Sequence, residues 1–254
     1  MLGGTGEANR LADLFASSGI SAVYSYAGRT SQPRAMPLPT RIGGFGGVDG
    51  LIAELQHGGF THVVDATHPF AAGMSRNAAL ACHSIGLPLI TLSRPQWDAV
   101  EGDRWISVPD MDAAAASLPS DAASVFLAIG RQQAGSFRNA PQHRYLLRVA
   151  DATGLGDEPE SLISNGLPPD CTVIEARGPF AVADELALLR QHGIGWMVSK
   201  NAGGAATAAK LTAARQLGIP VIMVERPAIS RPDGLRHHFA HDPGQIPALL
   251  QQIG

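Results

Sequence analysis

The amino-acid sequence predicts an α/β fold of two similar Rossmann-like or flavodoxin-like domains, with mostly parallel sheets and a ligand cleft between the domains. Three observations predict it. Short apolar runs alternate with amphipathic runs along all 254 residues, as in repeated βα units. Glycines at positions 3, 4 and 6 come just before the first helical pattern. Residues 86–95 match residues 218–227 almost position by position, which indicates an internal duplication, with convergence on a common turn as the alternative.

The spacing of apolar residues predicts the elements of the first domain, which we assign to residues 1–118. Leu11, Leu14 and Phe15 lie on one helical face, and Gly86 with Pro88 ends a helix before a strand. In chain order we expect a helix after the glycines, a strand at 22–26, a loop over 28–47, a helix at 49–56, a strand at 61–64, a helix at 71–84, a strand at 89–92, an irregular stretch after 95, and a helix at 111–118.

The second domain, assigned to residues 119–254, repeats this plan. We expect strands at 124–129, 145–149, 172–174, 196–198 and 221–224, with helices at 182–191 and 205–217. In each domain a polar loop follows an apolar strand and precedes an alanine-rich helix, as a duplication requires.

Composition and charge exclude several classes of function. The net charge of −3 and isoelectric point near 6.3 give no reason to expect nucleic acid or an anionic membrane as partner. Cys82 and Cys171 match no metal-ligand pattern and are expected to be buried thiols. His237, His238 and His241 show no ordered spacing, so we expect them to be exposed and expect no metal. Without a leader or a membrane-spanning run, the cytoplasm is the expected location.

The glycine-rich start of the first helix is a candidate phosphate site. Gly3, Gly4, Thr5, Gly6 and Glu7 lie where backbone N–H groups and the helix dipole favour an anion. The spacing departs from the full dinucleotide fingerprint, and a helix start without a ligand is an equally good interpretation. Only two residues precede the glycines, which is short for a first strand and leaves open a natural start upstream of residue 1.

Two further loops extend the cofactor hypothesis. Arg29 and Thr30 follow the second strand, where an NAD site usually has an acid, so they favour NADP over NAD; a surface arginine is the alternative. The loop Asp65-Ala66-Thr67-His68 places an acid, a hydroxyl and an imidazole directly after a strand. His68 could transfer a proton or orient a cofactor amide, and we favour the second role.

Basic residues suggest a substrate with several carboxylates. Lys200 and Asn201 follow a strand of the second domain, and Gly203 and Gly204 open an anion site or only cap a helix. Further arginines are individually typical of solvated charges and together suit a polycarboxylate: Arg76, Arg94, Arg131, Arg148 and Arg177. Ser75, beside Arg76, is a further candidate for contact with the substrate.

Taken together, these motifs resemble those of precorrin-6A reductases over residues 1–227. The strings that carry the resemblance are Leu2-Gly3-Gly4-Thr5-Gly6-Glu7, Asp65-Ala66-Thr67-His68-Pro69-Phe70-Ala71, Ser75-Arg76-Asn77-Ala78, Arg94-Pro95, Gly130-Arg131, Arg177-Gly178-Pro179-Phe180, Ser199-Lys200-Asn201-Ala202-Gly203-Gly204 and Gly218-Ile219-Pro220-Val221-Ile222. The departures are a clipped first strand and Ala202, at a position often held by Ser or another small residue.

The resemblance implies an oxidoreductase that uses NADPH to reduce precorrin-6A to precorrin-6B in cobalamin biosynthesis. It implies NADPH in the N-terminal domain and the carboxylate-bearing macrocycle on the C-terminal domain. We expect a monomer, although the sequence leaves the oligomeric state open. Lys200 and His68 are the catalytic candidates, although the proton could also come from water or substrate. Two alternatives stay open: reduction of the cobalt-bearing form of the macrocycle, and a non-catalytic NADPH-binding sensor.

Overall fold

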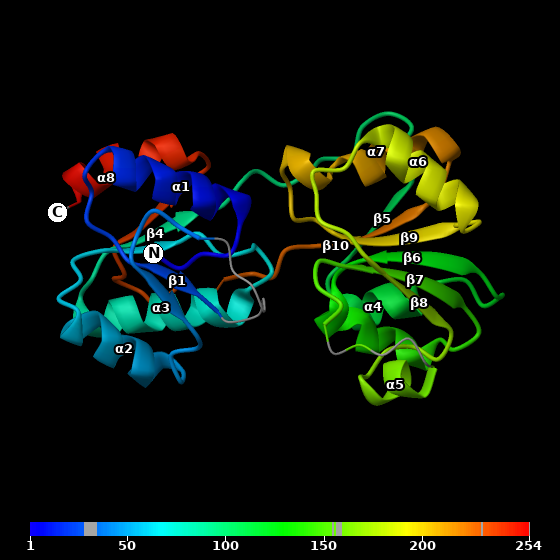
Figure 1. Cartoon of the computed structure of the whole chain (residues 1–254), viewed down its shortest axis with the longest axis horizontal. Coiled ribbons are helices and arrows are strands. Elements are labelled where there is room, and N and C mark those ends of the chain that lie inside the picture. Colours follow the sequence, from blue (N-terminus) through cyan, green and yellow to red (C-terminus); the bar gives the residue numbers. More distant parts are fainter. Residues whose placement is uncertain (28–34, 154, 156–158, 230, 254) are drawn as a thin grey trace. The chain divides into compact units, whose positions relative to one another are not determined.

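The computed structural model describes residues 1–27, 35–153, 155, 159–229 and 231–253 (Figure 1). The chain forms two compact units, one of Met1–Pro95 with Pro227–Gly254 and one of Gln96–Arg226. Each unit is built on a sheet in which every strand pair is parallel. The predicted α/β class with mostly parallel sheets is confirmed.

The sheet of the first unit is centred on the first residues of the chain. Leu2 forms parallel bridges to both β1 (Tyr24–Tyr26) and β3 (Val63–Asp65), and its N–H donates to the carbonyl oxygen of Val64 at 2.8 Å. Adding β2 (Thr40–Ile42), β4 (Leu89–Leu92) and β11 (His237–Ala240) gives the order β2-β1-Leu2-β3-β4-β11. With Leu2 counted as the first strand, this is the Rossmann order 3-2-1-4-5-6.

Helices cover both faces of this sheet (Figure 1). On one face lie α1 (Gly6–Ser17) and α8 (Ile246–Gln252), which share a core with β1 and the middle of β4. On the other face, α2 (Val48–His57) and α3 (Ala72–Ile85) pack on a second core that includes Leu2. A one-sided core would leave the central strand half exposed, so these two cores bury it.

The sheet of the second unit has the order β5-β10-β9-β6-β7-β8. Its strands are β5 (Trp105–Val108), β6 (Ser124–Ala128), β7 (Arg144–Val149), β8 (Cys171–Glu175), β9 (Trp196–Lys200) and β10 (Val221–Val224). Its helices are α4 (Met111–Ala116), α5 (Pro159–Ser164), α6 (Val182–Gln191) and α7 (Ala209–Leu217). Short 3₁₀ helices span Arg131–Asn139 and Ala205–Thr207 here, and Pro243–Gln245 in the first unit.

The matching decapeptides have the same structure in both units. Gly86 and Gly218 end α3 and α7 with φ angles of 71° and 65°, a left-handed conformation that favours glycine. The residue after each glycine donates to the equivalent helix carbonyl at 2.9 Å, Leu87 to Cys82 and Ile219 to Ala214. Because β4 and β10 also occupy equivalent positions in the two strand orders, the structure supports the predicted duplication.

The edge strand beside β4 and the edge strand beside β10 each come from the other half of the chain. In sequence β5 follows β4, yet it pairs with β10, and β11 follows β10, yet it pairs with β4. The ladders match, since Leu89 N–H donates to Arg236 and Val221 N–H donates to Arg104, both at 2.9 Å. The predicted boundary between residues 118 and 119 is therefore wrong, because each half of the chain supplies an edge strand to the other unit.

Three short strands, β2, β5 and β11, differ from the sequence-based expectation because their residues do not form apolar runs. The expected loop over 28–47 contains β2, and the irregular stretch after residue 95 contains β5. The expectation that His237 and His238 are exposed is wrong: both lie on β11 and are partly buried, and the Nε2 atom of His237 is 2.8 Å from Thr91 Oγ1. His241 is exposed as expected.

Candidate functional site

The two loops predicted to bind a cofactor meet at the carboxyl ends of the central strands of the first unit. The glycine loop follows Leu2, and the Asp65 loop follows β3, its neighbour in the sheet. The Thr5 hydroxyl joins the loops by donating to the carbonyl oxygen of Ala66 at 2.8 Å. It also accepts the N–H of Ala8 at 3.0 Å as the cap of α1. In open α/β sheets this switch point of the strand order is where ligands bind.

Different structural features distinguish the glycines at positions 3, 4 and 6 of the first loop. A Cβ atom on Gly3 would lie 2.2 Å from a ring carbon of Tyr24. Gly4 has a φ angle of 112° and donates its N–H to the Tyr24 hydroxyl at 2.8 Å. Burial raises the pKa of Tyr24 to about 12, although the bond from Gly4 lowers it, and the protonated hydroxyl donates to Asn9 Oδ1 at 2.9 Å. Packing against Tyr24 therefore explains Gly3, and the positive φ angle explains Gly4. At Gly6, an added Cβ would meet no described atom within 4 Å.

Asp65 shapes the second loop from inside the protein. Its side chain is buried, and its Oδ1 atom accepts the N–H and the hydroxyl of Thr67 at 3.0 and 2.6 Å. Its Oδ2 atom accepts the hydroxyl of Ser75 at 2.6 Å. Both carboxylate oxygens are thus engaged by the chain, and Ser75, predicted to contact the substrate, is buried against Asp65.

His68 lies at the partly exposed end of the same loop. Its Nδ1 atom accepts the N–H of Phe70 at 3.2 Å, so the neutral ring carries its proton on Nε2. This arrangement presents a donor nitrogen, which suits an amide-orienting role better than proton abstraction. Ala66 is buried behind the loop.

Acidic and basic residues are paired beside the glycine loop. Arg94 Nη1 lies 2.7 Å from Glu7 Oε2, and Arg10 lies 3.6 Å from the other oxygen of Glu7. Arg94 is thus neutralised by Glu7, and the pair removes the repulsion that a lone carboxylate would exert on a phosphate at the helix start. Arg76 is exposed on α3. The predicted residues Arg29 and Thr30 lie outside the described residues.

The second unit brings a corresponding pair of loops together after β6 and β9, which are adjacent in its sheet. Lys200 ends β9 and is partly buried. Gly203 and Gly204 follow with φ angles of 69° and 82°. The side chain of Asn201, predicted to contact the substrate, is instead hydrogen-bonded on both sides to the backbone of Trp97.

Two arginines of this unit donate to neutral oxygen atoms of the described chain. Arg131 donates to the carbonyl of Thr153 at 3.2 Å and to Asn165 Oδ1 at 2.8 Å. Arg177 donates to the carbonyl of Ala150 at 2.7 Å. Within the described residues neither forms a salt bridge. Their loops follow β6 and β8, so both cations are available to an anionic ligand at that end of the sheet.

Arg148, by contrast, has its charge neutralised by a carboxylate of the protein itself. It lies 2.6 Å from the buried Glu185 and stacks 3.9 Å from the centroid of the Phe180 ring. No local pattern predicts this ion pair, because the two residues are far apart in the chain. Tyr24 and Trp97 were likewise not identified as residues that hold the candidate loops.

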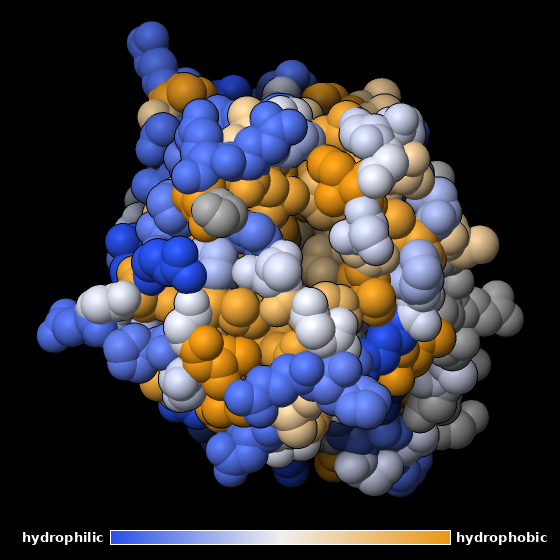
Figure 2. Space-filling model, turned by 90° about the vertical axis from the view of Figure 1, so that its left-hand side faces the viewer, coloured by the Kyte–Doolittle hydropathy of each residue, from blue (hydrophilic) through white to orange (hydrophobic). Residues whose placement is uncertain are grey.

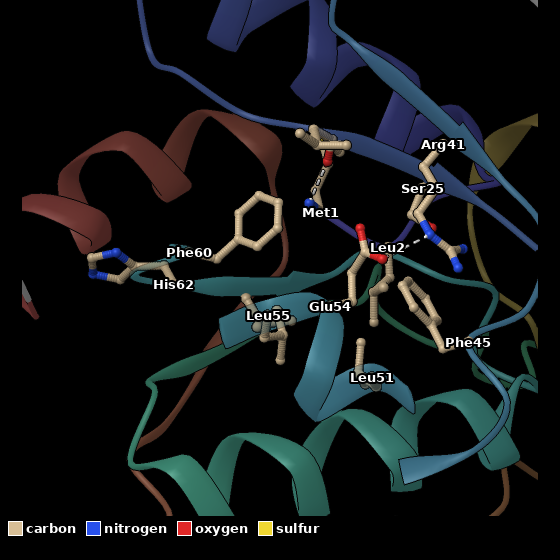
Figure 3. A pocket seen from close by; sticks show the side chains of 12 residues that line it. Met1, Leu2, Ser25, Arg41, Phe45, Leu51, Glu54, Leu55, Phe60 and His62 are labelled. Atoms are coloured by element: carbon tan, nitrogen blue, oxygen red, sulfur yellow. Dashed lines mark hydrogen bonds and ion pairs between the residues drawn. The ribbon is translucent and has the colours of Figure 1, made fainter. Parts of the chain in front are cut away.

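A pocket of the first unit lies away from these loops. Met1 lies in its wall with Phe45 and Phe60, and the Met1 amine donates to the carbonyl of Val23 at 2.7 Å (Figure 3). An adjoining pocket of about 590 Å³ shares Met1 and Phe60 and is bordered by Gly58. On the face shown in Figure 2, hydrophobic side chains border a hollow. The larger pocket is at the amino ends of the strands, opposite to the end where ligands of parallel sheets bind.

No group of three or more His, Cys, Asp or Glu side chains in the described part of the chain could hold a metal ion. None of its helices combines the length and the apolar character needed to cross a bilayer.

Known proteins similar to this chain agree with one another. The family profile described as "Precorrin-6x reductase CbiJ/CobK" matches residues 1–249. A precorrin-6A reductase of Rhodobacter capsulatus is 54% identical over 234 residues, covering 92% of this chain and 89% of that protein. A cobalt-precorrin-6A reductase of Methanothermobacter thermautotrophicus is 34% identical over 170 residues, covering 66% of this chain and 55% of that protein. A solved structure titled "CobK precorrin-6A reductase" superposes with a TM-score of 0.88 at 50% identity, covering 100% of this chain and 95% of that one.

Proposed function

Because the chain belongs to the precorrin-6x reductase CbiJ/CobK family, we propose that it reduces precorrin-6A to precorrin-6B in cobalamin biosynthesis with NADPH as reductant. The observation that carries the proposal is the contact between the two candidate cofactor loops, through Thr5 and Ala66, at the switch point of a Rossmann sheet. When bound, NADPH supplies the hydride. The protein's task is to bind and orient the two reactants.

The residues at the start of α1 fit a dinucleotide phosphate. The first helical hydrogen bond runs from Asn9 to Thr5, so the N–H groups of Gly6 and Glu7 precede the helix ladder. Open space at Gly6 allows a phosphate to approach them. The Glu7 carboxylate, held by Arg94, adds no unbalanced negative charge. We assign Gly3, Gly4 and Thr5 to the support of this cradle and Gly6 to the contact itself.

The loop after β3 is proposed to orient the nicotinamide. Asp65 fixes the loop through Thr67 and Ser75, which leaves His68 at its partly exposed end. The Nε2–H of His68 is the donor that we assign to the carboxamide oxygen of the cofactor. Rigid supports of this kind hold reacting groups in position at no entropic cost during the reaction.

The cations of the second unit are proposed to bind the acetate and propionate groups of the macrocycle. Arg131 and Arg177 keep their charges uncompensated among the described residues, and guanidinium groups bind carboxylates strongly. Lys200 would pair with a further carboxylate or stabilise charge on the ring as hydride arrives. Two candidate alternatives have less support. The cobalt-bearing substrate is named for relatives of lower identity, and a sensor would not need such cations.

Anaerobic incubation with enzymatically prepared precorrin-6A tests the proposal. We expect loss of the reduced-nicotinamide absorbance in a one-to-one ratio with the change in the macrocycle spectrum. NADH should react at least about tenfold less efficiently if the 2′-phosphate is recognised. Binding of NADPH without its oxidation, with both metal-free and cobalt-loaded substrate, would instead favour the sensor. Light scattering of the purified protein tests our further proposal of a monomer.

A further inference from the structure

One loop of the second unit, residues 201–204, is held by an unusually complete set of hydrogen bonds. The Asn201 side chain accepts the backbone N–H of Trp97 at 2.8 Å and donates to the Trp97 carbonyl at 2.9 Å. The indole N–H of Trp97 then donates to the carbonyl of Gly204 at 3.0 Å. The amide of Asn201 therefore pairs with the backbone of residue 97 as a neighbouring strand would.

Arg226 holds the same loop from another segment. Its Nε atom donates to the carbonyl of Asn201 at 2.9 Å, and its Nη2 atom donates to the carbonyl of Ala202 at 3.0 Å. Every carbonyl named so far accepts a bond from a side chain that lies more than 20 residues away in sequence. Distant contacts of this type fix a loop more firmly than local turns can.

A buried lysine completes the support. Lys210 is 4% exposed, donates to the carbonyl of Thr207 at 2.9 Å, and lies 4.6 Å from the centroid of the Trp97 ring. A cation facing the ring of tryptophan is attractive and becomes more so when water is excluded. The Trp97 ring is thus itself fixed, which makes it a rigid support for Gly204.

Trp97 and Arg226, which both bind the loop 201–204, lie at the two ends of the second unit. Trp97 is the second residue of the unit, and Arg226 is its last residue. Both connections between the units therefore attach to the loop that directly follows Lys200. Asn201 is 8% exposed, and both polar groups of its amide are engaged by the backbone of residue 97.

We propose that Asn201, Trp97 and Arg226 are positioning residues, which hold the backbone after Lys200 and the glycines 203–204 in the geometry that receives the macrocycle. On this proposal Asn201 does not bind the substrate directly, contrary to the sequence-based prediction. The proposal rests on the function proposed above. Placement errors near 1 Å are enough to reduce activity strongly, which is why such supports matter.

The Asn201→Asp variant is the sharpest test. The carboxylate can still accept the N–H of Trp97, but it cannot donate to the Trp97 carbonyl and instead faces it with a second oxygen. We expect the KM for precorrin-6A to rise about tenfold, a loss of about 1.4 kcal/mol in binding, while the Kd for NADPH stays within twofold. Asn139→Asp, at an exposed position of the same unit, adds the same charge and should change neither constant.

A second variant separates positioning from direct contact. Trp97→Phe keeps an aromatic ring beside Lys210 but removes the donor to Gly204, so it should raise the KM in the same direction by a smaller factor. A normal KM in Trp97→Phe together with a raised KM in Asn201→Asp would mean that Asn201 contacts the substrate, and would overturn the proposal.

Hydrogen exchange gives a readout that does not depend on activity. In the ligand-free protein, amides of residues 201–207 should exchange faster in both variants than in the wild type, because the loop loses tertiary hydrogen bonds. Unchanged exchange in both variants would overturn the positioning role. Failure of the wild type to reduce precorrin-6A would overturn the proposed function alone. Hydrogen exchange would still test whether Asn201 and Trp97 hold residues 201–204 in place.

Discussion

Replacing Gly6 with alanine should separate the stability of the first unit from its affinity for the cofactor. Gly6 is the first residue of α1, its φ is not in the left-handed region, and an added Cβ would meet no described atom within 4 Å. A Gly→Ala change under these conditions stabilises a protein by about 0.5 to 1 kcal/mol, because the unfolded chain loses freedom. We therefore expect no fall in the unfolding free energy of the variant.

The same methyl group would occupy the space through which a phosphate reaches the N–H groups of residues 6 and 7. Losing one close contact of this kind should raise the Kd for NADPH about tenfold, equivalent to about 1.4 kcal/mol. Fluorescence titration gives the Kd, and urea unfolding gives the stability of the same preparation.

The control for this variant is Gly195→Ala, just before β9, where an added Cβ would touch only the carbonyl of Ser124 at 4.0 Å. It should leave the Kd unchanged. If Gly6→Ala is stable and binds NADPH as the wild type does, the start of α1 does not hold the phosphate, and the cofactor assignment of the glycine loop is wrong.

Three further predictions concern buried polar groups. Asp65→Ala removes the acceptor of three hydrogen bonds and should lower the urea unfolding free energy by about 3 to 5 kcal/mol; a loss below about 1 kcal/mol would contradict its role in shaping the loop. Glu185→Gln leaves the charge of Arg148 buried without its partner, at a cost of about 3 kcal/mol or more, and the double change with Arg148→Met should recover much of that loss in the same assay. Burial lowers the pKa of His143, whose Nδ1 accepts the N–H of Ala123. The unfolded chain then binds the extra proton first, so stability should fall as pH drops below about 6.5, and less steeply in His143→Gln; equal slopes would contradict this origin.

The sequence was a good guide to elements that depend on local pattern. The helix predicted at 182–191 coincides with α6, and the strand predicted at 89–92 coincides with β4, because apolar periodicity and a glycine-proline turn act within a few residues. The match between residues 86–95 and 218–227 also located equivalent strands correctly. Such signals survive because neighbours in sequence determine them.

Predictions that depend on contacts between residues distant in sequence were less accurate. Trp105 and Ile106 begin a short edge strand of mixed polarity, so only their pairing with β10 identifies β5. In the candidate sites, Asp65 and Asn201 were singled out as polar residues that follow strands, and Ser75 as a neighbour of Arg76 in a predicted helix. The sequence could not tell that the side chains of all three face the protein. The residue type shows that a polar group needs partners, and only the fold shows which partners it has.

Because the edge strands cross between the halves of the chain, one unit is continuous in sequence and the other is divided into two segments. Residues 96–226 form an uninterrupted segment that contains all six strands of its sheet. The other unit is divided, and a separate version would require residue 95 to be joined to residue 227. During synthesis its sheet is completed only by β11, which leaves the ribosome after every strand of the other unit has been made.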